Sequence, residues 1–141
     1  MKNSRVPFLT TLLIVTFFLQ ATIVMAQAPS QTLWVAPPEA DELVNPIKEQ
    51  ALALTLGKRI YSSECQVCHG RYGNAETDIA ETLEQKPKNF TNEDFLKQSD
   101  GAIYWKLSEG RGLMQPFKTM LSEEEIWSVV MYVKELAGAK E

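Results

Sequence analysis

The chain has 141 residues, 45% of them apolar, and it carries 18 acidic side chains against 14 basic ones. This length and composition fit a single globular domain. The formal charge of −4 argues against a nucleic-acid-binding protein, which needs an excess of basic side chains to neutralise phosphates. Two cysteines and one histidine are too few for a four-cysteine metal site or a histidine-rich one. The sequence therefore has the side chains for one strong chemical centre.

Residues 1–26 have the pattern of a signal peptide. Two basic residues near the start are followed by a long apolar run, and small residues end that run at Ala26. Cleavage after Ala28 is an alternative, and so is an uncleaved anchor, because about twenty apolar residues can span a bilayer. We therefore expect a periplasmic protein, which would face the periplasm from the inner membrane if the segment is retained.

Residues 27–46 are predicted to form an extended leader, because they contain several prolines and no helical periodicity. Trp34 and Val35 could dock part of this leader on the domain, and a tether without fixed structure is the alternative. The folded domain is expected to occupy residues 47–141.

Helices are predicted throughout this domain. The last one is predicted from a capping box of Ser122 and Glu125, which precedes an apolar stripe at helical spacing. No strand pattern competes, so the sequence predicts an all-α fold. In chain order the segments before the last one are Pro46 to Ser63 with Asn45 as its cap, Asp78 to Leu83, Asn92 to Gln98, and Asp100 to Glu109.

Cys65, Cys68 and His69 form the C-x-x-C-H pattern of c-type haem attachment. Two thiols at this spacing can each add to one haem vinyl group, and the next residue is then placed to bind the iron through its imidazole. The pattern predicts one covalently attached haem c and its iron as the cofactor.

Three other uses of these side chains fit the sequence less well. A thioredoxin-like dithiol needs a βαβ context that the sequence lacks. A zinc site needs a fourth protein ligand, and no second histidine or further cysteine can provide one. A disulfide between two such close cysteines constrains the unfolded chain little. Covalent haem is the interpretation that the context favours.

A sixth iron ligand is expected to be a methionine, because no second histidine exists. Met114 lies on an irregular loop with glycine before it and proline after it, which can direct a side chain towards iron. Met120 is the alternative, and Met131 has the position of a helix core residue. We predict His69 as the proximal axial ligand and Met114 as the distal one.

The stretch from Gly57 to Leu136 resembles the small monohaem class I cytochrome c family. The resemblance is carried by the residues before the haem motif, the motif itself, residues 101–106, the Met114 to Phe117 loop and residues 121–127. It implies four to five short helices wrapped around one haem. It also implies that the first and last helices cross near a glycine and an aromatic residue, here Gly57 or Tyr61 against Trp127 or Tyr132. Many members carry Met-Pro-x-Phe, whereas Gln115 follows the methionine here.

Further residues are candidates for packing on the haem. Pro87 is expected near the imidazole of His69, with a neighbouring carbonyl that accepts the Nδ1–H hydrogen bond. Tyr104 and Trp105 are expected to pack on the porphyrin, and the Trp105 indole could donate to a propionate. A turn at Pro87 and a helix core at the two aromatic residues are the alternatives.

The expected function is a periplasmic electron carrier rather than an enzyme, with redox proteins as its donor and acceptor and no nucleic-acid partner. Iron with both axial positions filled has no open site for substrate. A subunit of a larger periplasmic or membrane-bound oxidoreductase complex is the first alternative. A haem sensor with a displaceable sixth ligand is the second.

Overall fold

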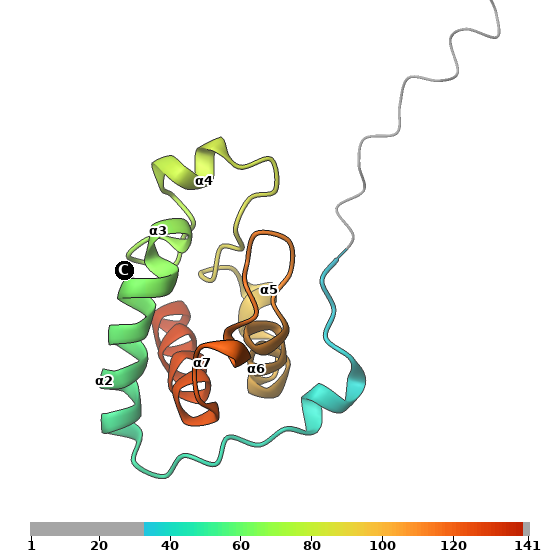
Figure 1. Ribbon diagram of the computed structural model, residues 1–141, viewed down its shortest axis with the longest axis vertical. Helices are drawn as coiled ribbons and strands as arrows, with labels where there is room; N and C mark the ends of the chain where they lie inside the picture. Colours follow the sequence, from blue (N-terminus) through green and yellow to red (C-terminus); the bar gives the residue numbers. More distant parts are fainter. Residues whose placement is uncertain (1–32, 140–141) are drawn as a thin grey trace, which may run out of the picture. The chain divides into compact units, whose positions relative to one another are not determined.

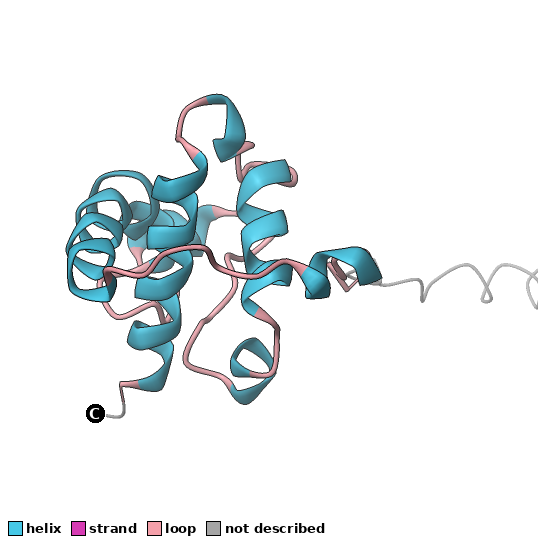
Figure 2. Ribbon diagram, turned by 90° about the horizontal axis from the view of Figure 1, so that it is seen from below, coloured by secondary structure: helices cyan, strands magenta, loops and turns pink. Residues whose placement is uncertain are grey.

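The computed structural model describes residues 33–139, and the regular elements in that range are all helical. Figures 1 and 2 show the helices gathered around a core in which α2 and α7 lie against each other. The all-α expectation is confirmed. The predicted signal peptide lies outside the described residues. The elements are η1 (Pro38–Glu42), α2 (Gln50–Ile60), η2 (Tyr61–Cys65), α3 (Gln66–His69), α4 (Asp78–Thr82), α5 (Glu93–Leu96), α6 (Asp100–Glu109), η3 (Phe117–Thr119) and α7 (Glu123–Gly138).

The first long helix is continuous from Gln50 to His69, because α2, the π-helical turn η2 and α3 follow one another without a break. It begins later than the sequence predicted and continues through the haem motif. The predicted start at Pro46 was wrong: the Asn45 side chain accepts a hydrogen bond from the Ile47 N–H at 2.9 Å, but the regular helix begins only at Gln50. Asn45 therefore stabilises a local turn ahead of the helix.

The crossing of α2 and α7 forms the centre of the core. A Cβ atom on Gly57 would lie 2.0 Å from the Ser128 carbonyl oxygen, so only glycine allows the two backbones to come this close. The rings of Tyr61 and Tyr132 pack 5.3 Å apart beside this contact. Tyr61 is completely buried, and its hydroxyl donates to the Gly70 carbonyl at 2.6 Å. Of the two predicted aromatic partners on the last helix, Trp127 and Tyr132, the structure has Tyr132 at this crossing.

The start of α7 contains the complete predicted capping box. The Ser122 hydroxyl accepts from the Glu125 N–H at 3.3 Å, and the Ser122 N–H donates to the Glu125 carboxylate at 2.9 Å. Hydrogen bonds from Ser122 lower the pKa of Glu125 below its usual value. The box satisfies backbone donors that the first turn of a helix leaves without intrahelical partners.

Replacing Ser122 with alanine should therefore reduce the free energy of unfolding by about 1 kcal/mol at neutral pH. Part of this loss requires an ionised Glu125, whose pKa is lowered in the folded state. That part is present above the unfolded-state pKa and disappears as the pH falls through the folded-state value. Urea unfolding of the wild type and of Ser122→Ala at pH 7 and at pH 3 measures both parts. A difference that grows on acidification would contradict this account.

The leader departs from the predicted extended form. Residues Pro38–Glu42 make the 3₁₀ helix η1, which packs against α6. Its middle residue, Ala40, is only 1% exposed. The departure arises from a long-range contact with Gly101 that local sequence patterns do not contain.

The short helices agree more closely with the prediction. Helix α6 has the predicted bounds, and Ser99 caps it by accepting from the Ala102 N–H at 2.9 Å. Asn92 caps α5 and Thr77 caps α4 in the same way. No helix in residues 33–139 is both long enough and apolar enough to cross a membrane.

Candidate functional site

The two cysteines and the histidine lie at the carboxyl end of the first long helix. Cys65 is the last residue of the π turn and is buried, whereas Cys68 on α3 is half-buried, and no disulfide joins the two. Gly70 ends the helix with φ of +79°, a conformation that L side chains rarely adopt. A Cβ there would also lie 2.8 Å from the Asn74 side-chain oxygen. The sequence can therefore stop the helix directly after His69.

His69 is held in one orientation by a backbone carbonyl and an aromatic ring. Its Nδ1 lies 3.1 Å from the Lys88 carbonyl oxygen, and its ring stacks on Phe90 with centroids 4.5 Å apart. A carbonyl can only accept, so Nδ1 carries the proton. Burial lowers the pKa of His69, and the Lys88 carbonyl opposes this shift in part. The result is a neutral imidazole whose Nε2 lone pair is available to a metal.

The carbonyl that holds His69 belongs to the residue directly after Pro87. Pro87 itself is half-buried in the segment that leads from α4 to α5. The fixed φ of proline restricts the backbone next to this carbonyl. Phe90, two residues further, completes the wall beside the imidazole, and no local pattern in the sequence distinguishes it.

Before haem attachment, the surroundings of Cys65 favour the protonated form of its thiol. Burial raises the pKa of this thiol to about 12, with further increases from the negative charge of Glu64 and from Cys68. A protonated thiol is a poor nucleophile and oxidises slowly. It retains the S–H bond that adds across a vinyl group when a thioether forms.

An apolar pocket adjoins the Cys65 side chain. It is lined by residues from α2, η2, α6, η3 and α7 and from the turn between the last two, with no charged side chain among them. A planar, apolar cofactor attached at Cys65 would meet apolar side chains here, and the donor set of two cysteines and one histidine fits a covalently bound haem. The lining residues are Ile60, Cys65, Leu107, Phe117, Leu121, Ile126 and Val129.

The candidate methionines differ in their surroundings. Met114 is half-buried and packs against the core, on a loop closed by two backbone hydrogen bonds with Arg111, of 2.7 and 3.0 Å. Gly110 allows this loop, because its φ is +65° and a Cβ there would lie 2.4 Å from the Met114 carbonyl oxygen. Met120 follows η3 and is 54% exposed. Met131 is half-buried on α7.

Two aromatic candidates occupy another part of α6. Tyr104 stacks on Trp127 of α7, with ring centroids 4.3 Å apart and an interplanar angle of 20°. Trp105 is half-buried next to it. The pocket lining described above includes Leu107 from this helix but neither of these two residues. The Tyr104–Trp127 stack fixes α6 against α7.

The chain is similar in sequence to known c-type cytochromes. Residues 52–133 match the family described as cytochrome C oxidase, cbb3-type, subunit III. The chain is also 30% identical to cytochrome c6 of Leptolyngbya boryana over 81 residues, which are 57% of this chain and 89% of that protein. It is 31% identical to cytochrome c6 of Parathermosynechococcus lividus over 89 residues, 60% of this chain and 92% of that protein.

The chain belongs to the c-type cytochrome family, on a family match that covers more than half of its length. It is an electron-transfer protein with covalent haem c, as the C-x-x-C-H motif predicted. An electron carrier of this kind works with redox protein partners.

Proposed function

We propose that the mature protein is a periplasmic electron carrier with one haem, attached through Cys65 and Cys68. His69 is its proximal iron ligand and Met114 its distal one. The observation that carries this proposal is the Lys88 carbonyl 3.1 Å from His69 Nδ1, which leaves Nε2 of a neutral imidazole for the iron. A haem bound here supplies one-electron chemistry between Fe(III) and Fe(II).

The protein side chains keep the surroundings of such a centre nearly unchanged between the two oxidation states. The carbonyl of Lys88 and the ring of Phe90 prevent the His69 ring from turning. The apolar lining excludes water, and low solvent access with methionine ligation raises the reduction potential.

Met114 is the preferred distal ligand because its loop is fixed and its side chain faces the core. Its half-buried position contrasts with the exposed side chain of Met120. A thioether that binds buried iron has to leave water, and Met114 already lies at the core surface. Phe117, three residues after Met114, lines the pocket.

The proposed function also requires export of the protein to the periplasm. We infer that residues 1–26 are removed and that the domain matures in the periplasm, with the retained anchor as the alternative. Oxidising conditions there would pair free cysteines, and thioether formation with haem protects Cys65 and Cys68 from that outcome.

A denaturing intact mass of protein from cells that can mature c-type cytochromes tests these points together. We expect the mass of residues 27–141 or 29–141 plus one haem. A haem-bearing mass that retains residues 1–26 would indicate a membrane-anchored cytochrome. A mass without haem would contradict the proposal and return both cysteines to thiol chemistry.

A subunit of a larger oxidoreductase is the second candidate, favoured by the description of the matched family as an oxidase subunit. Size-exclusion chromatography of gently extracted membranes and of the soluble fraction distinguishes the two. A carrier elutes alone in the soluble fraction, whereas a subunit elutes with its complex.

A displaceable sixth ligand, as in a haem sensor, would be shown by carbon monoxide binding to the reduced wild-type protein.

A further inference from the structure

The leader contains a docked segment that precedes the matched family region. We call residues 38–43 the N-terminal strap; they comprise η1 and Leu43, and the family match begins only at residue 52. The strap packs on α6, which is about sixty residues later in the sequence. It is therefore an addition to the part of the fold that the family comparison describes.

The strap contacts α6 through backbone atoms. A Cβ on Gly101 would lie 2.0 Å from the Ala40 carbonyl oxygen and 2.9 Å from both the Leu43 Cβ and its carbonyl oxygen. Only a residue without a side chain permits this approach. Ala40 is almost completely buried by it. Because Gly101 has no side chain, the strap can pack directly against the backbone of α6.

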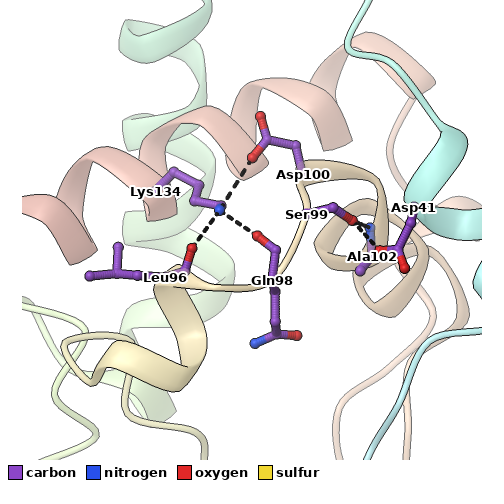
Figure 3. A network of polar contacts seen from close by, with 7 residues as sticks. All are labelled: Asp41, Leu96, Gln98, Ser99, Asp100, Ala102 and Lys134. Carbon is purple, nitrogen blue, oxygen red and sulfur yellow. Dashed lines mark hydrogen bonds and ion pairs between the residues drawn. The ribbon is translucent and has the colours of Figure 1, made fainter.

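A hydrogen bond joins the strap to the first turn of α6. The Ser99 hydroxyl donates to the Asp41 carboxylate and, at the same time, accepts from the Ala102 N–H at 2.9 Å (Figure 3). One hydroxyl therefore both caps α6 and binds the strap. Disturbing the strap changes the surroundings of the group that starts this helix.

Helix α7 holds the same junction through Lys134 (Figure 3). Its ammonium donates to the carbonyls of Leu96 at 3.2 Å and Gln98 at 2.5 Å, and it lies 3.5 Å from the Asp100 carboxylate. The strap and Lys134 thus both hold the junction where α5 ends and α6 begins. Together they restrict both the position and the rotation of α6.

Helix α6 borders the predicted site of haem attachment at Cys65. Leu107 lines the apolar pocket beside Cys65, and Tyr104 stacks on Trp127. The pKa of Lys106, which is partly buried on α6, is lowered by burial and by the charge of Lys88. The charge of Asp41 in the strap opposes that shift. Any movement of α6 would change the pocket wall and the charges next to it.

We propose that the N-terminal strap is a positioning element of the redox centre, which seats α6 through Gly101 and Ser99 and thereby sets the reduction potential. This inference rests on the proposed function, because the potential is that of the haem. Loss of the strap contacts should loosen α6 and admit water to the pocket. Water stabilises the more highly charged Fe(III) state, so the midpoint potential should fall.

The test uses the full chain with haem attached and two variants. Gly101→Ala places a methyl group where the strap carbonyl lies. Ser99→Gly removes the hydrogen bond to Asp41, while glycine costs a helix cap only a few tenths of a kcal/mol. Asn92→Gly is the matched control, because Asn92 caps α5 rather than α6, through the Phe95 N–H at 3.0 Å.

Spectroelectrochemistry gives the midpoint potential, and hydrogen exchange of the α6 amides reports on its position. We expect a negative shift in potential for both test variants and α6 exchange that is about tenfold faster or more, with neither change in Asn92→Gly. If Gly101→Ala does not fold, Ser99→Gly decides alone. Faster exchange at an unchanged potential would overturn the inference, and so would equal shifts in the control. Wild-type protein without haem would instead contradict the proposed function, and the strap proposal with it.

Discussion

Replacing Gly57 with alanine is expected to reduce the free energy of unfolding by about 3 kcal/mol. The new Cβ would lie 2.0 Å from the carbonyl oxygen and 2.6 Å from the carbonyl carbon of Ser128, and neither backbone atom can move without α7. Overpacking of a tight contact typically costs about 1–3 kcal/mol, and a rigid backbone neighbour places this site at the upper end. Thermal unfolding followed by circular dichroism of the haem-bearing protein measures the loss.

Gly138→Ala is the control for this experiment. Gly138 ends α7, and a Cβ there meets nothing within 4 Å. Alanine has the higher helix propensity, so the control should leave the unfolding temperature unchanged or slightly raised. If both glycine variants unfold at the same temperature, the close contact between α2 and α7 does not limit stability.

Met114→Ala is expected to open the sixth coordination position of the iron and to lower the reduction potential. The thioether is the ligand that raises the potential, and alanine cannot replace it. Reduced Met114→Ala should therefore bind carbon monoxide at once, whereas the wild type should resist it. Visible absorption spectra with and without carbon monoxide measure the effect, and redox titration gives the potential.

Met120→Ala is the matched control, because this second methionine is 54% exposed just after η3. Its spectra and potential should equal those of the wild type. The reverse pattern, with a silent Met114→Ala and an altered Met120→Ala, would assign the ligand to Met120.

Local patterns in the sequence predicted the parts of the fold that depend on neighbouring residues. The bounds of α6 and the capping box of Ser122 and Glu125 were correct because both depend on contacts within a few residues. The order of Cys65, Cys68 and His69 is equally local. Covalent haem could therefore be inferred from the sequence before any fold was known.

Long-range contacts account for what the sequence did not show. The 3₁₀ helix of the strap depends on its contact with Gly101, about sixty residues later in the chain. The stacking of Phe90 on His69 joins residues 21 positions apart in a segment without periodicity. None of these contacts leaves a pattern in adjacent residues.

The candidate site also combines features that the sequence indicated with features that only the fold brings together. The sequence indicated that a carbonyl next to Pro87 would accept the imidazole Nδ1–H, with an ordinary turn as the alternative, and the structure has the Lys88 carbonyl oxygen 3.1 Å from Nδ1. The apolar lining from Phe117, Leu121 and Val129 comes from elements that only the fold brings together.

The π turn at Tyr61–Cys65 sets the rotational phase between two parts of one helix. Such a turn contains about one residue more than an α-helical turn, and each residue turns the chain by about 100° around the helix axis. The π turn therefore rotates the face that carries the cysteines about the helix axis, relative to the face that meets α7 at Gly57. The number of residues between Gly57 and Cys65, independent of their chemical identity, decides which way the attachment site faces.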